Sequence, residues 1–300
     1  MNVVVTGGAG FIGSYLVKQL VKSNQNVTVI DSMYRGNLDN LSSVIDKIKF
    51  HKIDIRNFDE LKNILKQVDG VFHEAALTDV QESFTKQNEY YDVNVVGTEN
   101  IFRLANEFGF KVIYASSSSI YGNPKIIPIS ENSERNPINP YGQTKLEDEF
   151  LAEKYVKLGA SIIGLRYFNV YGKGQTGSYA GVITKFINNL RERKSPVIFG
   201  DGTQIRDFVY VEDVALANIS AMQSSVKDGF FNVGTGITTS VKKLAQILID
   251  ISGLSLEPQH KDPLNGDVNA SQADISLTKK MLGWEYTVNL EDGLRRFFPF

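Results

Sequence analysis

The sequence predicts an α/β fold in which a doubly wound parallel sheet carries a smaller C-terminal substrate-binding lobe. Two observations support this prediction. Short apolar runs alternate with amphipathic stretches through the first half of the chain, which is typical of a parallel sheet with helices on both faces. A glycine-rich segment follows the first apolar run directly. With 300 residues, the chain can form one large α/β unit or two unequal lobes.

The apolar runs of the first half are short enough to be strands, and the stretches between them have helical periodicity. We expect strands at residues 3–6, 27–31, 48–54, 70–74, 111–116 and 161–167. We expect helices at residues 11–23, 58–66, 93–108 and 141–158.

The alternation weakens after residue 169, which divides the chain into residues 1–169 and 170–300. In the second part we expect loops at 172–178, 200–203 and 257–266, and helices at 182–190, 213–223, 241–252, 277–282 and 290–297. We take residues 1–169 as a dinucleotide-binding domain and 170–300 mainly as the smaller lobe, with some segments returning to the sheet. A ligand is expected in the cleft between them.

The composition excludes several classes of function. A formal net charge of −2 provides no basic surface for nucleic acid or anionic lipid. The absence of cysteine excludes disulfides and thiolate catalysis, and with three histidines we expect no metal site. We see neither a signal-like segment nor an apolar run of the roughly 20 residues that span a bilayer, so we expect no membrane partner and a cytoplasmic protein.

The glycine-rich segment at residues 7–13 predicts a dinucleotide site of the Rossmann type. Gly7, Gly10 and Gly13 lie between the first expected strand and the first expected helix, where glycines permit a tight turn and close approach to a pyrophosphate. Asp31 closes the second strand, 18 residues after Gly13, and its carboxylate can accept hydrogen bonds from the adenosine ribose. We therefore predict NAD rather than NADP as cofactor. Arg35 could weaken that preference, and a loop-capping role for Asp31 is the alternative.

Tyr141 and Lys145 are candidate catalytic residues because they lie one helical turn apart and share one face of a helix. Beside a positively charged nicotinamide, Lys145 favours the phenolate, so Tyr141 can act as general base or acid. Four serines at 116–119 follow an expected strand and should emerge at the cofactor's edge of the sheet, although loop material is the alternative for most of them.

Together these segments resemble the extended short-chain dehydrogenase/reductase family and, within it, the NAD-dependent nucleotide-sugar epimerases, the group that includes the UDP-glucose 4-epimerases. The resemblance covers nearly the whole chain. Its motifs are Thr-Gly-Gly-Ala-Gly-Phe-Ile-Gly at 6–13, Asp-Ile at 54–55, His-Glu-Ala-Ala at 73–76, Asn-Val-Val-Gly-Thr at 94–98, Ser-Ser-Ser-Ser-Ile-Tyr-Gly at 116–122, Tyr-Gly-Gln-Thr-Lys at 141–145, Arg-Tyr-Phe-Asn-Val-Tyr-Gly at 166–172 and Gly-Asp-Gly-Thr-Gln-Ile-Arg-Asp-Phe at 200–208.

The resemblance implies roles for single residues. It makes Ser117 the catalytic hydroxyl, Tyr141 the base and Lys145 the lysine that holds the cofactor. Besides the three glycines, Asp31, Tyr141 and Lys145, the implied NAD contacts are Phe11, Ile12, Asp54, Ile55, Ala75, Ala76, Asn94 and Phe168. Besides Ser117, the implied substrate contacts are Asn169, Phe199, Arg206, Asp267 and Ser271.

The chain departs from the family at two phosphate-binding positions. Where many members have arginines, three residues before and two residues after Asp267, this chain has Leu264 and Asn269. Arg206 is then the cation expected to bind the diphosphate.

The reaction that the resemblance implies is epimerisation at C4 of a UDP-hexose through a 4-keto intermediate. Family dehydratases carry an Asp-Glu pair after the catalytic hydroxyl, and Ser118 and Ser119 stand there in this chain. Ser271 occupies the position where a tyrosine excludes N-acetyl groups in related epimerases, so we expect N-acetylhexosamines to be accepted. UDP-glucuronate epimerisation or decarboxylation, a small-substrate dehydrogenase and a non-catalytic dinucleotide sensor are the alternatives. Apolar faces on helices 93–108 and 141–158 lead us to expect a homodimer, with intrachain packing as the alternative.

Overall fold

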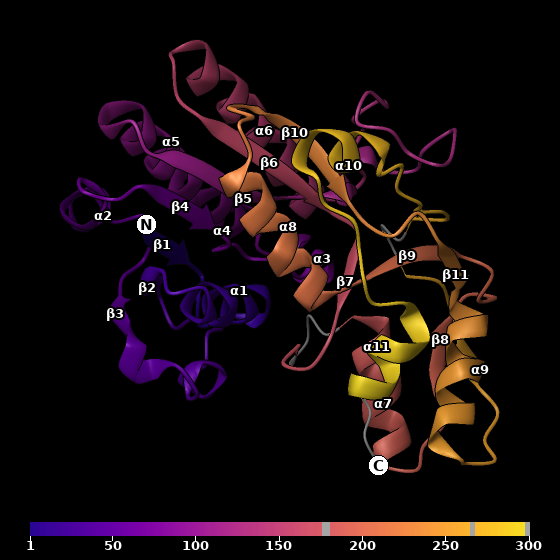
Figure 1. Ribbon diagram of the computed structural model, residues 1–300. Coiled ribbons are helices and arrows are strands. Elements are labelled where there is room, and N and C mark those ends of the chain that lie inside the picture. Colours follow the sequence, from indigo (N-terminus) through magenta and orange to yellow (C-terminus); the bar gives the residue numbers. More distant parts are fainter. Residues whose placement is uncertain (176–180, 265–267, 298–300) are drawn as a thin grey trace.

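The computed structural model describes residues 1–175, 181–264 and 268–297, and its largest element is a parallel sheet of seven strands (Figure 1). The strand order is β10-β6-β5-β4-β1-β2-β3, and every neighbouring pair is parallel. The strands are β1 (Asn2–Thr6), β2 (Asn26–Asp31), β3 (Ile48–Lys52), β4 (Gly70–His73), β5 (Lys111–Ser117), β6 (Ile162–Tyr167) and β10 (Gly229–Val233). The predicted doubly wound fold is confirmed.

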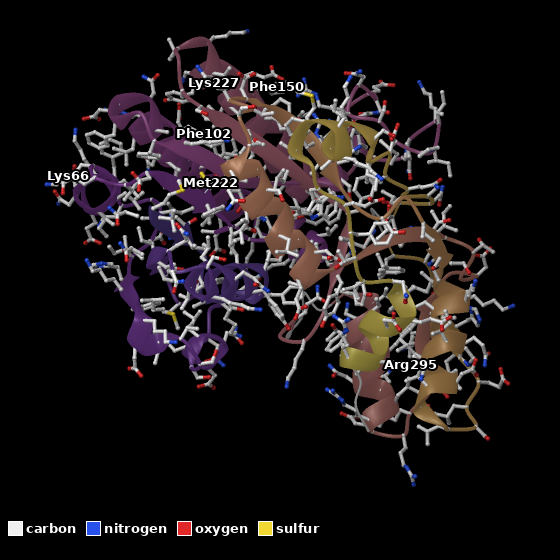
Figure 2. The ribbon with its side chains drawn as sticks, viewed as in Figure 1. Lys66, Phe102, Phe150, Met222, Lys227 and Arg295 are labelled. Atoms are coloured by element: carbon white, nitrogen blue, oxygen red, sulfur yellow. The ribbon has the colours of Figure 1, made fainter. Side chains whose placement is uncertain are left out.

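Helices cover both faces of this sheet. On one face α1 (Phe11–Lys22) and α8 (Val211–Gln223) enclose a core with Val3 and Val5 of β1 and with the valines of β2. On the other face lie α2 (Phe58–Leu65), α5 (Gly97–Phe108) and α6 (Pro140–Lys157). Figure 2 labels one core residue from each side, Met222 of α8 and Phe102 of α5. Since β10 and α8 follow residue 169, the second part of the chain contributes to these layers.

The helix predicted at 93–108 begins earlier than expected. The helical run starts with α4 (Gln87–Tyr90), continues through a π-helical turn (Tyr91–Val96) and ends as α5. Asn94 lies in the π turn, and its amide binds both backbone groups of Leu77. Such an insertion is common at functional sites, and no simple 3.6-residue period reveals it.

The second part of the chain forms a separate group of elements with its own core. Two small sheets, β11-β9-β7 and β12-β8, pack with the helices. The elements are β7 (Asn169–Tyr171), α7 (Val182–Arg191), β8 (Val197–Phe199), β9 (Ile205–Tyr210), β11 (Thr238–Ser240), α9 (Val241–Ser252), β12 (Gln259–Lys261) and α11 (Leu290–Phe297). Helix α10 (Ser276–Leu282) instead packs against β10 and α8 of the large sheet, and its Leu282 belongs to the core there.

The sequence analysis missed all the strands of this part, and the loop predicted at 257–266 is wrong where β12 runs. Most of these strands have only three residues, which is too short to show a hydrophobic period. In β12 all three residues are exposed, so this strand has no hydrophobic signal at all. The remaining short elements are α3 (Val80–Ser83) and the 3₁₀ turns Leu38–Leu41, Ile45–Lys47 and Ser118–Tyr121. Within the described ranges, no helix has the combination of length and hydropathy needed to cross a bilayer.

The parallel arrangement decides where a ligand can lie. Strands β1, β2, β4, β5 and β6 all end at the same edge of the sheet. The residues at these ends, Gly7, Asp31, Glu74, Ser117 and Phe168, are therefore brought together although they are far apart in the sequence.

Candidate active site

A cavity of about 720 Å³ opens at this edge of the sheet. Most of the residues proposed from the sequence for cofactor and catalysis line it: Gly7, Gly10, Phe11, Ile12, Gly13, Asp31, Asp54, Ile55, Ala75, Ala76, Ser117, Tyr141, Lys145 and Phe168. Asn169 and Glu74 line it as well. The structure thus gathers these residues around one cavity from the ends of strands β1 to β6, from β7 and from helices α1 and α6.

The glycine loop leaves room for an anion because backbone, not side chains, forms its surface. Gly7 has a φ of +67°, and a Cβ there would lie 2.7 Å from the amide nitrogen of Ala75. A Cβ on Gly13 would overlap the carbonyl oxygen of Gly7. Helix α1 begins after Gly10 with no side chain capping it. Its first N–H groups can therefore bind a pyrophosphate.

Asp31 is held in a fixed orientation at the end of β2. Its carboxylate accepts hydrogen bonds from the backbone N–H groups of Ala9 at 3.0 Å and Met33 at 2.8 Å. Burial raises the pKa of Asp31, and these two donors oppose that shift. Arg35 forms an ion pair with Glu82. Because Glu82 already neutralises the charge of Arg35, this arginine attracts a 2′-phosphate less strongly. The site at Asp31 therefore suits a ribose hydroxyl better than a 2′-phosphate.

Asp54 and Ile55 lie beyond β3 and close the same end of the cavity. Arg56 donates to both oxygens of Asp54, at 2.9 and 2.6 Å. The hydrogen bond from Arg56 is the main reason why the pKa of Asp54 lies below its ordinary value.

Ser117, Tyr141 and Lys145 reach the cavity from β5 and α6. Helix α6 starts with Asn139 as N-cap, whose side chain accepts from the N–H of Gly142, and with Pro140 in its first turn. Tyr141 therefore lies in the first turn and Lys145 one turn later. Ser117 ends β5, where its hydroxyl oxygen accepts from the N–H of Ser119 at 3.1 Å.

A buried ion pair fixes α6 against the sheet. Arg166 of β6 makes two bonds of 2.8 Å to the two carboxylate oxygens of Glu149, which is fully buried. Ser116 of β5 donates to the same carboxylate at 2.8 Å. These contacts hold the helix and two strands in one arrangement, in which Ser117, Tyr141 and Lys145 line the cavity.

Two carboxyl groups that the sequence analysis did not single out lie close to Lys145. Asp148 accepts a hydrogen bond from Lys145 at 3.0 Å. Glu74 accepts one from the hydroxyl of Tyr167 at 2.8 Å. Burial raises the pKa of each carboxyl group to about 7, and Lys145 opposes both shifts. The spacing of Tyr141, Lys145 and Asp148 on one helical face could have indicated Asp148.

The electrostatic balance keeps Lys145 charged. Burial lowers its pKa, but Asp148 raises it, as do the nearby Tyr141 and Glu74, and the net direction is upward. His73 remains neutral, since burial and the lysine lower its pKa to about 3. Its ring bridges the hydroxyls of Thr6 and Thr98 at 2.7 and 2.9 Å.

A second cavity of about 280 Å³ adjoins the first, and Ser119 and Asn169 line both. Two of the predicted substrate contacts, Arg206 and Ser271, line this smaller cavity, and Leu264 lines it as well. Lys185 of α7 also lines it, and the sequence analysis missed this residue because α7 carries no motif. The lining of the smaller cavity therefore includes two cationic side chains and one carboxyl group, that of Asp79.

Two predicted contacts line neither cavity. Asn94 is fully buried behind the large cavity, where its amide binds Leu77 and the hydroxyl of Thr144. Phe199 lies in β8, outside both cavities. Asp267 lies outside the described residues.

Comparison with known proteins agrees with this geometry. The family model of the NAD dependent epimerase/dehydratase family matches residues 3–234. A putative UDP-glucose 4-epimerase of Methanocaldococcus jannaschii is 39% identical over 98% of this chain and 96% of its own. Two solved structures superpose with a TM-score of 0.95 at 35% identity and cover 99% of this chain. One is a UDP-glucose 4-epimerase of Thermotoga maritima with UDP-glucose, and the match spans 97% of that chain. The other is a UDP-N-acetylglucosamine 4-epimerase of Methanobrevibacter ruminantium with UDP-N-acetylmuramic acid, and the match spans 96% of that chain.

The residues of the large cavity fit NAD. A Cβ on Gly7 or Gly13 would collide with backbone, so this tight loop requires glycine at both positions. The uncapped start of α1 suits a diphosphate, and the buried carboxylate of Asp31 suits a ribose. The resemblance inferred from the motifs is confirmed: this chain is an NAD-dependent enzyme and belongs to the NAD dependent epimerase/dehydratase family.

Proposed function

We propose that this chain is a 4-epimerase of UDP-hexoses that interconverts UDP-glucose and UDP-galactose through a 4-keto intermediate. One observation carries the proposal. Ser117, Tyr141 and Lys145 share a wall of the cavity that fits NAD, and this cavity adjoins a second one with Arg206 and Lys185. A sugar joined to a diphosphate matches this arrangement, because the sugar can lie beside Ser117, Tyr141 and Lys145 while the diphosphate lies between Arg206 and Lys185, whose two charges exceed the single charge of Asp79 in the same lining.

The proposed chemistry needs only groups of this wall and the cofactor. Bound NAD supplies the hydride acceptor for C4 of the sugar and the donor that returns the hydride. The oxygen of Tyr141 takes the proton of the C4 hydroxyl as this hydroxyl becomes a ketone, and it returns the proton when the hydride comes back to the opposite face. Ser117 holds the C4 oxygen by a hydrogen bond, and Lys145 favours the phenolate. No external oxidant is consumed.

We further propose that Lys185 and Arg206 together bind the diphosphate. The two family arginines are replaced by Leu264, which is apolar, and by Asn269, whose backbone N–H donates to Asn123. Lys185 lies in the lining of the same cavity and is exposed. A second cation there compensates for the missing arginines. The bound diphosphate then anchors the substrate while the 4-keto hexose rotates in the cavity.

Dehydration is the reaction that this site supports least, because Ser118 and Ser119 supply no carboxylate beside Ser117. We expect the N-acetylhexosamine pair to be accepted, since Ser271 leaves space in the lining of the smaller cavity that a tyrosine would fill. UDP-glucuronate is the second candidate substrate, because Lys185 can also face a sugar carboxylate.

The test is to incubate the protein with UDP-galactose, UDP-N-acetylgalactosamine and UDP-galacturonate, and to resolve the products by chromatography. We expect conversion of the first two to their gluco epimers. Conversion of UDP-galacturonate alone would replace the hexose proposal with a hexuronate one, and bound NAD without turnover of any UDP-sugar would favour a dinucleotide sensor.

We also propose that the protein is a cytoplasmic homodimer. Apolar side chains are exposed along the helices expected to pair, with 45% exposure at Phe150 of α6 and 51% at Tyr91 in the π turn (Figure 2 labels Phe150). Light scattering should give about twice the 33.4 kDa mass of the chain. A mass of one chain at micromolar concentration would contradict the homodimer and mean that these apolar side chains do not pack against a second copy.

A further inference from the structure

A buried acidic residue, Asp148, contacts Lys145 behind the lining of the large cavity. It lies three residues after Lys145 and seven after Tyr141, so all three share one face of α6. The ammonium of Lys145 donates to its carboxylate at 3.0 Å, and the two side chains are 3% and 0% exposed. Lys145 lines the large cavity, whereas Asp148 lines neither cavity. The lysine thus stands between a fixed negative charge and the reacting groups.

Other titratable groups face this pair from each neighbouring element, but none of them provides the same contact. They are His73 and Glu74 at the end of β4, Tyr114 on β5, Tyr141 and Glu149 on α6, and Tyr167 on β6. Glu149 is bound by Arg166, and Glu74 by Tyr167. Among the residues that the structure describes, Asp148 is the carboxylate that hydrogen-bonds the lysine.

We propose that Asp148 is a positioning residue for Lys145, whose ammonium its carboxylate holds at the cavity wall, facing Tyr141 and the NAD site. A lysine stem has four rotatable carbons and three donors, so an anchored ammonium keeps two donors for the cavity. Without a counter-charge, a lysine this buried loses its charge or turns away. The inference rests on the proposed function, in which Lys145 serves Tyr141 and the cofactor.

The anchor has a pH dependence of defined sign. Burial raises the pKa of Asp148 to about 7, and the lysine opposes that shift. Below this pH the carboxyl is neutral and offers the ammonium only an uncharged acceptor. Above it the ion pair forms, and charge-assisted bonds are roughly twice as strong as neutral ones. Asparagine has nearly the same shape as the neutral form, so the variant Asp148→Asn should resemble the wild type at low pH and differ from it at high pH.

The experiment is a calorimetric titration of the full chain with NAD at pH 5.5 and pH 8.5. We expect Asp148→Asn to bind NAD within twofold of wild type at pH 5.5 and about tenfold more weakly at pH 8.5, with kcat following the same ratio. Glu147→Gln is the matched control. It removes a carboxylate from the adjacent position of α6, where Glu147 accepts a hydrogen bond from Gln143 of the same helix, and it should match wild type at both pH values. Asp148→Glu, which keeps the charge, should retain the pH dependence.

Several results would overturn the proposal. One is that the NAD affinity of Asp148→Asn, relative to that of wild type, is the same at pH 5.5 and pH 8.5. Another is that Glu147→Gln changes NAD affinity as much as Asp148→Asn does. A third concerns Glu74, whose pKa is also raised to about 7. If Glu74→Gln removes the pH dependence of NAD affinity while Asp148→Asn keeps it, Glu74 is the group responsible. Should the asparagine variant fail to fold, Asp148→Ser carries the same comparison. NAD affinity is measured without sugar, so these results hold whether or not the sugar reaction proves correct.

Discussion

The two adjoining cavities are built in different ways. The cofactor side of the large cavity consists of residues at or just after the carboxyl ends of strands β1 to β5 and at the start of α1, and backbone packs closely around Gly7 and Gly13. The smaller cavity combines side chains from α3, the turn after β5, α7, β9 and the segment at 268–271. The first is specified by local motifs, and the second by packing of distant segments. Changes in the first should therefore remove function altogether, whereas changes in the second should adjust which substrate is bound and how tightly.

The largest expected effect is at the catalytic wall. Tyr141→Phe removes only the oxygen that transfers the proton, so kcat should fall by about a thousandfold while NAD affinity stays within twofold. Product chromatography and calorimetry measure the two quantities. Tyr155→Phe is the control, since Tyr155 lies on the same helix, outside both cavities, and donates to Glu99. Activity of the Tyr141 variant within a few fold of wild type would remove Tyr141 from the proposed mechanism.

The glycine loop tests whether backbone forms the cofactor surface. In Gly7→Ala the new Cβ would meet backbone atoms of Glu74 and Ala75 at 2.7 to 2.9 Å, and we expect NAD to bind about a hundredfold more weakly. Gly253→Ala is a matched control. Gly253 has nearly the same φ, +65° against +67°, but no atom lies within 4 Å of its Cβ position. The control should lose about 1 kcal/mol of stability and no NAD affinity. Equal loss of affinity in both variants would mean that backbone strain alone is responsible.

The smaller cavity tests substrate choice. Ser271→Tyr should lower kcat/KM for UDP-N-acetylgalactosamine by roughly thirtyfold and change that for UDP-galactose by less than threefold, because a filled pocket excludes the acetamido group. Ser276→Tyr, at an exposed serine outside both cavities, should change neither value. Equal losses with both sugars in the Ser271 variant would contradict a pocket beside the C2 substituent.

The smallest effect is expected at the second cation. Lys185→Met should raise KM for UDP-galactose about fivefold and leave kcat and NAD affinity unchanged, because it weakens a partly solvated contact to the substrate anchor. Added salt should reduce the difference from wild type. Lys194→Met, at an exposed lysine paired with Glu192, controls for the loss of a charge. An unchanged KM would leave Arg206 as the cation that accounts for diphosphate binding.

The difference between the cavities also explains how far the sequence analysis reached. Gly7, Asp31 and Tyr141 could be located because each stands at a strand end or helix start that is recognisable from local periodicity and turn chemistry. The strands β7 to β9, β11 and β12 could not, because most are only three residues long and are stabilised by pairing with distant partners. Lys185 and Glu74 were missed for the same reason, since no local pattern indicates which cavity a side chain lines.

The sequence by itself determined the doubly wound sheet and the position of the glycine loop, and it proposed Ser117, Tyr141 and Lys145 for catalysis. These depend on short-range rules: the hydrophobic period, the glycine turn and the spacing of side chains along one helix. Only the tertiary structure decided that Asp148 backs Lys145, that Asn94 holds Leu77 behind the cavity, and that Lys185 joins Arg206. Burial and contact between distant segments decide such matters, because they set the charge that a carboxyl group carries and the side chains that meet across a cavity.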